Sequence, residues 1–385
     1  MNVLFAGGGT GGHLFPAVAV IEALRETAPE ARPLFVLGGS RGASLLERYG
    51  IAWRSIPVRG MPRGGAARMP LFALRLVAGT VASLALTARL RPAAVLAMGG
   101  YASTPVAFAA RLLGRPVFAA EQNAVAGVAT RWNARFARRL FLGYEGALSG
   151  APRGCALETT GIPVRREILR GDRARALDRW GLDGDRRTVL VLGGSQGARG
   201  LNRLVIGALR LWGREGEGAQ VLFQTGEADW ETVRDSCGRI APLVRPHPFL
   251  DEMGDAYAAA DLVICRAGAS TLAEINAVGL PAVLVPFPAA TDRHQSKNAL
   301  HLARSGAAIA REEEEWTPEA LLVAVQGLLE NEKLRSEMAN RSRALGRPDA
   351  AERIAARLTE AMGKGKRRAR TDVGEAGARA GTGDE

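Results

Sequence analysis

The chain has 385 residues, 47% of them hydrophobic and 23% charged, a composition typical of a soluble globular protein with about two domains. Its three cysteines, Cys155, Cys237 and Cys265, form no CxxC pair, which argues against a zinc knuckle and a disulfide framework and fits a reducing cytosol. The first residues run directly into an apolar strand pattern, so no signal peptide is expected.

Positive charge is concentrated in one block of the sequence. The formal net charge is +12, and residues 51–150 alone hold 13 basic and 2 acidic side chains, an excess of 11. A block of this kind suits a nucleic acid, an anionic membrane or an anionic substrate.

Short apolar runs of strand length alternate with stretches of helical spacing from the N-terminus onward. The runs expected as strands in the first part of the chain are Val3–Ala6, Leu34–Leu37, Ala94–Ala97, Val117–Ala119 and Leu140–Leu142. Helical spacing occurs at Pro16–Thr27 and Thr104–Leu113. This alternation predicts a parallel sheet that is covered by helices on both faces.

The pattern breaks over residues 150–187 and restarts at Thr188–Leu192, where a strand and a glycine turn repeat the beginning of the chain. We therefore predict the α/β class, with two Rossmann-like doubly wound domains whose phosphate-type turns face a common cleft. The expected boundaries are 1–162 for the N-terminal domain and 163–345 for the C-terminal domain. Residues 346–362 should form a helix that packs back toward the N-terminal domain, and 363–385 a disordered tail.

The first glycine turn, Gly7 to Gly12, matches GxGxxG, which alone suggests a dinucleotide or simply a tight strand–helix turn. A nicotinamide site also needs an acidic residue at the end of the second strand, but that strand ends in Leu37-Gly38-Gly39-Ser40. His13 follows the turn at the start of the helix. It is either a structural histidine or a group that accepts or orients a hydroxyl proton near neutral pH.

The stretch from Ala260 to Ala299 is the most informative part of the chain. A buried strand, Leu262–Cys265, leads through a tight turn, Arg266 to Thr271, into a helix that contains Glu274. Free N–H groups and the dipole at a helix N-terminus favour phosphate. A second strand, Ala282–Val285, ends beside a polar cluster. Together, a phosphate cradle, a carboxylate for two ribose hydroxyls and nearby amides indicate a nucleotide-sugar site.

The apolar stretch Met69 to Leu90 has two interpretations. It is either a buried crossover helix or a helix with one face on an anionic membrane, flanked by arginines. Its alanines, its hydroxyl side chains and its arginines argue against a helix that spans the bilayer.

Asp183-Gly184-Asp185 matches a metal-binding DxD motif, but it precedes a strand and is predicted to be a turn. No other cluster has the spacing of metal ligands, so we expect no metal cofactor, and Arg266 and helix dipoles would neutralise the phosphates.

These motifs recur in one order that resembles the MurG family of bacterial glycosyltransferases. The segments that carry the resemblance are Gly7-Gly-Gly-Thr-Gly-Gly-His13, Met98-Gly-Gly-Tyr-Ala-Ser103, Glu121-Gln-Asn123, Gly161-Ile-Pro-Val-Arg165, Gly193-Gly-Ser-Gln-Gly-Ala198, Cys265-Arg-Ala-Gly-Ala-Ser-Thr271 with Glu274, and Asp292-Arg-His-Gln295 with Asn298. The resemblance implies a GT-B fold with the donor site in the C-terminal domain. It also implies inverting transfer of GlcNAc from UDP-GlcNAc to the 4-hydroxyl of undecaprenyl-linked MurNAc-pentapeptide, the lipid I to lipid II step of peptidoglycan synthesis.

The resemblance assigns roles position by position. Glu274 would hold the ribose hydroxyls, and the uracil would be bound near Phe249-Leu250. The GlcNAc would be bound by Asn123, His294 and Gln295. The donor-binding residues implied are Thr10, Gly11, Gly12, Asn123, Arg165, Ser195, Arg266, Ala269, Ser270, Thr271, Glu274, His294 and Gln295. The acceptor-binding residues implied are Gly8, Gly9, His13, Gly100 and Tyr101. The membrane patch implied is Arg63, Arg68, Leu71, Phe72, Arg75 and Arg89.

His13 is the candidate general base, while a carboxylate or a purely dissociative route stays open. The expected partners besides the two substrates are anionic inner-membrane lipids and other cell-wall synthesis enzymes, and the expected location is the cytoplasmic face of the cell membrane, as a peripheral protein. Ala120 and His294 depart from residues found in some members, which bears on individual sugar contacts.

Three alternatives remain. UDP-GlcNAc 2-epimerases share the architecture, and a diacylglycerol galactosyltransferase would differ in its donor. A nucleic-acid-binding protein would use the basic block, but that block lacks the interleaved aromatic side chains that single-strand binders use, so we expect no nucleic acid partner.

Overall fold

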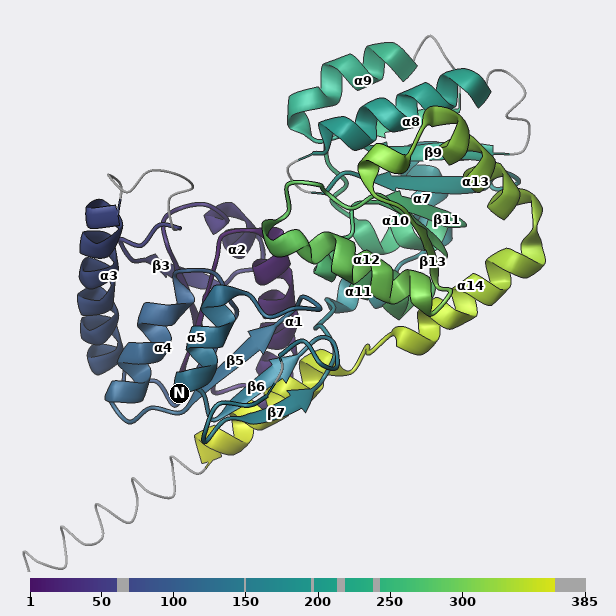
Figure 1. The fold of residues 1–385 in the computed structure, drawn as a ribbon. Coiled ribbons are helices and arrows are strands. Elements are labelled where there is room, and N and C mark those ends of the chain that lie inside the picture. Colours follow the sequence, from purple (N-terminus) through teal and green to yellow (C-terminus); the bar gives the residue numbers. More distant parts are fainter. Residues whose placement is uncertain (61–68, 149, 195–196, 213–218, 238–242, 364–385) are drawn as a thin grey trace, which may run out of the picture. The chain divides into compact units, whose positions relative to one another are not determined.

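The computed structural model describes residues 1–60, 69–148, 150–194, 197–212, 219–237 and 243–363 (Figure 1). The chain forms two compact units. Unit 1 comprises Met1–Glu121, Ala126–Thr160 and the chain from Asp349 onward, whereas unit 2 comprises Gln122–Val125 and Gly161–Pro348. The short segment Gln122–Val125 thus belongs to unit 2, which differs from the unbroken 1–162 domain expected from the sequence. The candidate residues Arg63, Arg68 and Ser195 lie outside the described residues.

Unit 1 is built on a seven-stranded parallel sheet with the strand order β3-β2-β1-β4-β5-β6-β7. The strands are β1 (Asn2–Gly7), β2 (Arg32–Leu37), β3 (Ala52–Ser55), β4 (Ala94–Ala97), β5 (Val117–Glu121), β6 (Arg139–Leu142) and β7 (Ala156–Thr159). The helices are α1 (Gly11–Thr27), α2 (Ala43–Arg48), α3 (Met69–Leu90), α4 (Ser103–Leu112), α5 (Val128–Phe136) and a final helix over residues 350–363.

Unit 2 has a six-stranded parallel sheet with the order β10-β9-β8-β11-β12-β13. The strands are β8 (Arg187–Leu192), β9 (Ala219–Gln224), β10 (Val244–His247), β11 (Leu262–Cys265), β12 (Ala282–Leu284) and β13 (Ala308–Ala310). The helices are α6 (Arg166–Leu169), α7 (Arg173–Trp180), α8 (Arg199–Trp212), α9 (Trp230–Cys237), α10 (Met253–Ala259), α11 (Ala269–Val278), α12 (His294–Arg304), α13 (Pro318–Glu330) and α14 (Glu332–Leu345). Both sheets have the strand order of a doubly wound Rossmann fold, so the predicted fold class is confirmed.

Every strand that the sequence predicted is present, with ends shifted by at most a few residues. Helix α1 begins at Gly11 and not at Pro16, which lies inside the helix and is buried. The earlier start places His13 in the first turn of a 17-residue helix.

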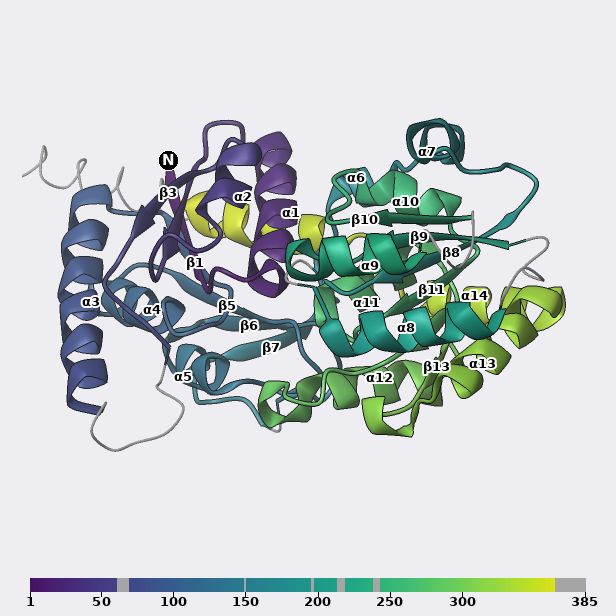
Figure 2. The ribbon, with the colours of Figure 1, turned by 90° about the horizontal axis from the view of Figure 1, so that it is seen from above.

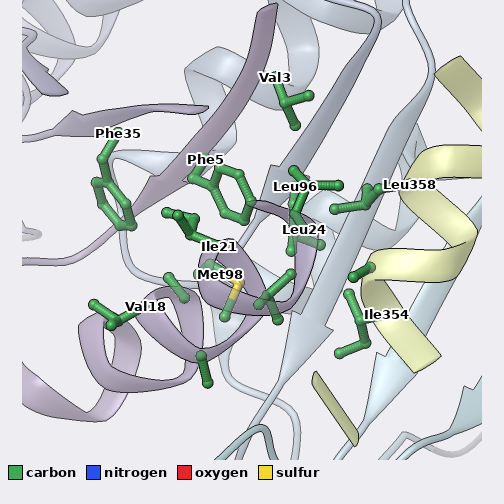
Figure 3. Packing of buried hydrophobic residues seen from close by; sticks show 14 of the residues in the cluster. Val3, Phe5, Val18, Ile21, Leu24, Phe35, Leu96, Met98, Ile354 and Leu358 are labelled. Carbon is green, nitrogen blue, oxygen red and sulfur yellow. The ribbon is translucent and has the colours of Figure 1, made fainter. Parts of the chain in front are cut away.

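The core of unit 1 contains residues of both the first strand and the final helix (Figure 3). Phe5 of β1 and Leu96 of β4 pack with Leu24 of α1, and Ile354 and Leu358 of the final helix close the same cluster. All five are fully buried, and full burial of each such side chain contributes roughly 1.5–3 kcal/mol. The final helix is therefore an integral part of unit 1.

Helix α3 lies at the outer edge of unit 1, beside α4 in both views (Figures 1 and 2). Its buried stripe consists of small and polar residues, Gly79, Ser83 and Thr87. Its apolar side chains face outward instead, with Leu74 65% and Val77 62% exposed. The interpretation of this segment as a buried crossover helix is therefore wrong. By length and composition it is the one helix in the described part of the chain that is long and apolar enough to cross a membrane.

Glu158 of β7 joins the final helix to the sheet of unit 1. Its carboxylate pairs with Arg139 and with Arg357, whose Nε lies 3.2 Å from Oε2. Burial raises the pKa of Glu158, but hydrogen bonds from Arg357 and Arg139 outweigh burial and hold the pKa below its ordinary value. A lowered pKa in the folded state stabilises the protein above the unfolded pKa, and this contribution is lost as the pH falls through the folded value.

We predict that Glu158→Gln lowers the free energy of unfolding by about 1 kcal/mol at pH 7, because two charge-assisted hydrogen bonds to partly exposed arginines are weakened. The difference from the wild type should fade below about pH 4, where the carboxylate takes up a proton. Urea unfolding at both pH values measures it. Glu360→Gln, on the final helix that also carries Arg357, serves as the control, because the Glu360 side chain is more than half exposed. An equal loss at both pH values would contradict the prediction.

Candidate functional site

In each unit, the strand order alone identifies one place where a ligand can bind. In unit 1 the order reverses between β1 and β4, and in unit 2 between β8 and β11. At such a switch point the loops after the two strands diverge to opposite faces of the sheet and leave room for a ligand at their carboxyl ends. Most of the predicted site residues follow these four strands in the sequence, whereas Asn123, Arg165, His294 and Gln295 follow β5, β7 and β12.

The loops at the switch point of unit 1 approach each other backbone to backbone. Gly8 N donates to Gly99 O at 3.1 Å. Gly99 and Gly100 have φ angles of +93° and +75°, which favour glycine. A Cβ on Gly100 would lie 2.8 Å from Gly8 N, so a side chain at position 100 would force the loops apart.

His13 stands over this glycine contact. Its Nδ1 lies 3.2 Å from Thr10 Oγ1, and a Cβ on Gly8 would come within 2.9 Å of the same nitrogen. The imidazole is partly exposed in the first turn of α1. The contact with Thr10 orients the imidazole beside the glycine loops, and an imidazole can accept a hydroxyl proton near neutral pH.

An open pocket of about 640 Å³ brings together the residues predicted to bind the acceptor. Its lining includes Gly8, Gly9, Thr10, His13, Gly100 and Tyr101. Arg41 and Arg59 also line it, and neither was predicted from the sequence. Thr10, assigned to the donor by resemblance, therefore shares a pocket with the acceptor residues.

In unit 2 the loop after β11 leads directly into α11. Gly268, which has no side chain to cap the helix, is the N-cap, so backbone N–H groups of the first turn face outward at Ala269 to Thr271. The loop after β8 begins at the same switch point, and its Gly194 and Gly197 have φ angles of +83° and +75°. A glycine-rich turn beside a helix N-terminus makes a suitable site for a diphosphate.

Glu274 lies in the middle of α11 and is 7% exposed. Arg165 Nη2 donates to its Oε1 at 3.0 Å, and the Tyr257 hydroxyl donates to its Oε2 at 3.0 Å. Arg165 also pairs with Glu167. A buried carboxylate is tolerated when it is paired in this way, and the two donors fix its orientation.

Arg266 braces the ends of two strands. Its Nη1 donates to the carbonyls of Val285 and Pro286 at 3.0 and 3.1 Å, and its Nη2 pairs with Glu313. The guanidinium also lies over the ring of Phe287, 5.6 Å from its centroid. The structure thus gives Arg266 a structural role at the predicted phosphate site, and a phosphate would share this cation with Glu313.

Asn298 of α12 connects the predicted sugar-binding loops of unit 2. Its Oδ1 accepts from Ala124 N at 2.9 Å, and its Nδ2 donates to Ala267 O and to Asn123 Oδ1, both at 3.3 Å. The side chain is completely buried. Asn123 is therefore held at the loop after β11, although 140 residues or more separate the two in sequence.

The first turn of α12 carries the other two candidate sugar contacts. Gln295 Oε1 accepts from Phe287 N at 2.9 Å, and His294 Nδ1 lies 2.6 Å from Thr291 O. Asp292 and Arg293 precede them with φ angles of 51° and 50°, a conformation that costs on the order of 1–3 kcal/mol each outside glycine. Such strain suits a loop whose shape serves a site.

Sequence reasoning missed Tyr257, Glu313 and Gln224. Gln224 ends β9, where its side chain accepts from Leu250 N at 3.1 Å and donates to Gly194 O at 3.2 Å. A polar residue directly after the apolar strand was a usable signal. Tyr257 gave none, because a tyrosine in an alanine-rich helix resembles an ordinary core residue.

Comparison with known proteins shows the family of this chain. Residues 3–142 match the glycosyltransferase family 28 N-terminal domain, and residues 188–354 match the glycosyltransferase family 28 C-terminal domain. The UDP-N-acetylglucosamine–N-acetylmuramyl-(pentapeptide) pyrophosphoryl-undecaprenol N-acetylglucosamine transferase of Desulforudis audaxviator (strain MP104C) is 38% identical over 95% of this chain and all of its own length. The chain belongs to the MurG family.

Other members and solved structures agree. The transferase of the same name from Bacillus subtilis (strain 168) is 35% identical over 94% of this chain and 99% of its own. The crystal structure of Acinetobacter baumannii MurG matches with a TM-score of 0.73 and 30% identity over 93% of this chain and 99% of that one. A UDP-GlcNAc 2-epimerase from Neisseria meningitidis has a TM-score of 0.68, covering 94% of this chain and 100% of its own, but only 11% identity, so that likeness concerns the fold alone.

We predict that Asn298→Ala lowers the stability of unit 2 by about 2 kcal/mol, because it leaves buried backbone groups of two loops without their partner. The measurement is urea unfolding. Lys297→Ala, which removes an exposed side chain from the same helix, is the control. If the two variants unfolded at the same urea concentration, Asn298 would not be holding these loops.

Proposed function

We propose that this chain transfers N-acetylglucosamine from UDP-GlcNAc to undecaprenyl-pyrophosphoryl-MurNAc-pentapeptide, the step from lipid I to lipid II in peptidoglycan synthesis. The observation that carries this is the 35–40% identity to MurG transferases over more than nine-tenths of the chain. The two switch-point sites, one per unit, supply places for two substrates.

The donor binds in unit 2. Its diphosphate takes the N-terminus of α11 and the glycine turn after β8, where N–H groups and the helix dipole offset negative charge. Glu274 accepts hydrogen bonds from the ribose hydroxyls. Asn123, His294 and Gln295 lie on the loops assigned to the sugar.

The acceptor sugar binds in unit 1, in the pocket that His13 and Tyr101 line. The MurNAc 4-hydroxyl attacks the anomeric carbon of the α-linked GlcNAc as UDP departs, giving a β-1,4 bond with inversion. His13 takes the hydroxyl proton. As negative charge develops on the leaving diphosphate, the N–H groups of α11 stabilise it, and loss of one such donor typically costs about 10²–10³ in rate.

No metal is needed in this scheme, because the cradle of N–H groups and Arg266 serve the leaving group. The experiment that tests the function incubates radiolabelled UDP-GlcNAc with purified protein and a lipid-linked MurNAc-pentapeptide in the presence of EDTA. Label in the extracted lipid, with matched UDP release, supports both the transfer and its independence of metal. Free UDP and an altered sugar in the absence of acceptor would instead indicate epimerase chemistry.

We predict that Glu274→Ala raises the KM for UDP-GlcNAc at least about ten-fold, since both ribose hydroxyls lose their acceptor and Arg165 loses its buried partner. The KM for the lipid acceptor should stay unchanged. Steady-state assays with each substrate varied in turn distinguish the two. Glu337→Ala, an exposed carboxylate on α14, is the control. If the KM for UDP-GlcNAc were unaltered in the Glu274 variant, the placement of the ribose at α11 would be wrong.

We also propose that unit 1 docks on anionic lipid at the cytoplasmic face of the cell membrane. Leu71, Leu74, Val77 and Val81 project outward from α3, and each is about half exposed or more. Trp132 of α5 and Leu112 of α4 add to the apolar side chains exposed on unit 1. The buried small residues fix the other face of α3 to the protein, so the helix lies on the membrane surface.

Basic side chains accompany this apolar face. Arg89 is exposed at the end of α3, and Arg75 is partly exposed nearer its start. An open pocket of about 230 Å³ at the amino ends of β5 and β6 has several arginines in its lining: Arg111, Arg115, Arg135, Arg138 and Arg153. Phosphate headgroups would neutralise this charge, each arginine near the surface contributing about 1 kcal/mol.

Leu74→Asp combined with Val77→Asp should reduce binding to phosphatidylglycerol vesicles at least about ten-fold, because two apolar side chains lose their lipid contact and two negative charges are added. UDP binding should not change. Vesicle co-sedimentation measures the effect. Val323→Asp, at an equally exposed position of unit 2, is the control. Equal vesicle binding by both variants would rule out α3 as the docking surface.

A further inference from the structure

Resting on the proposed function, we infer that Tyr257 is a positioning residue for the donor: with Arg165 it aims the Glu274 carboxylate at two neighbouring ribose hydroxyls and so makes the site selective for a ribonucleotide. Tyr257 touches neither substrate in this proposal. It acts through Glu274 alone.

The contact is well defined. Tyr257 belongs to α10, which packs against α11, and it is 2% exposed. Its hydroxyl donates to Glu274 Oε2 at 3.0 Å, while Arg165 Nη2 donates to Oε1 at 3.0 Å. Each carboxylate oxygen therefore has its own donor, from a different element of unit 2.

The Glu274 carboxylate can accept more hydrogen bonds than Tyr257 and Arg165 donate to it. An ionised carboxylate has about four acceptor directions, two on each oxygen. Tyr257 and Arg165 each occupy one, which leaves one direction on each oxygen. Two vicinal hydroxyl groups present two donors side by side, so the 2′- and 3′-hydroxyls of a ribose match what remains.

Arg165 and Tyr257 contribute differently. Arg165 supplies the charge that lets a carboxylate stay ionised at a buried position. The Tyr257 hydroxyl adds no charge, and burial, together with the nearby Glu274 carboxylate, raises its pKa well above the ordinary value, so it remains a donor throughout the neutral range. Tyr257 therefore contributes orientation. Its hydrogen bond to Oε2 keeps the Glu274 carboxylate from rotating about the last bond of the side chain.

The test is Tyr257→Phe, which removes one oxygen and keeps the ring. Isothermal titration calorimetry compares UDP with 2′,3′-dideoxy-UDP. We expect the variant to bind UDP about ten-fold more weakly than the wild type, and to bind the dideoxy analogue within about two-fold of the wild type. The preference for the ribonucleotide should therefore shrink by a similar factor. If Tyr257 had a merely structural role, the variant would bind both ligands more weakly by the same factor. That result would overturn the inference.

Two further variants make the outcome unambiguous. Tyr144→Phe alters the buried tyrosine that follows β6 in unit 1 and should change neither affinity. Glu274→Gln should remove the preference for UDP over its dideoxy analogue. If it does so while Tyr257→Phe leaves the preference intact, the inference about Tyr257 fails alone. If Glu274→Gln leaves the preference intact, the placement of the donor ribose in the proposed function fails instead.

Discussion

The reversal of strand order in each parallel sheet is the constraint on which the rest of this structure depends. Beside β1 and again beside β8, the chain crosses to the opposite face of the sheet, so two loops leave the same edge in opposite directions. In unit 1, glycine lets the two loops approach within hydrogen-bonding distance, as Gly8 does with Gly99. The glycine motifs are therefore a consequence of topology first, and their use in binding follows from the N–H groups they expose.

A second constraint acts at the switch point of unit 2, where charges are buried. Glu274 and Arg266 are both 7% exposed, and each has partners on other elements. A buried charge without a partner costs several kcal/mol, so each pair ties a loop or helix to the strand ends. This arrangement makes the site rigid before a ligand arrives, which reduces the entropy that binding has to overcome.

The sequence predicted most central strands, although it missed β9, and it missed the edge strands for a physical reason. Central strands such as β4 and β11 are buried on both faces and appear as continuous apolar runs. The edge strands β3 and β7 have the sequences AWRS and ALET, with exposed or half-buried residues throughout, so no apolar run marks them. Edge strands are defined by backbone pairing to a neighbour, which composition does not encode.

Long-range contacts could not be predicted from the sequence for a similar reason. The segment Gln122–Val125 belongs to unit 2 and is bonded there by the side-chain amide of Asn298, which is 174 residues away from Ala124. Likewise, the Tyr257 hydroxyl becomes informative only when Glu274 is seen beside it. The motif residues themselves were found because they cluster at strand ends, a position that chain order does reveal.

Helix α3 and the glycine pocket of unit 1 are physically connected, and this connection would relate the proposed membrane docking to the proposed acceptor site. A Cβ on Gly79 of α3 would collide with Val58, which lines the pocket. The ring of Phe72, also on α3, meets the ring of Tyr101 edge to face at 6.1 Å, and Tyr101 lines the same pocket. Phe72 is therefore less a lipid contact than a link between the two regions.

The same link explains why α3 shows its apolar side chains to the outside. A lipid-anchored acceptor holds its sugar within a few bonds of the membrane surface, so a pocket for that sugar has to open close to the bilayer. A helix that buries Gly79, Ser83 and Thr87 against the protein can approach the pocket closely, because its inward side chains are short. In the proposed docking on anionic lipid, its long apolar side chains are then left for the lipid. The outward position of the apolar residues is what a protein docked in this way requires.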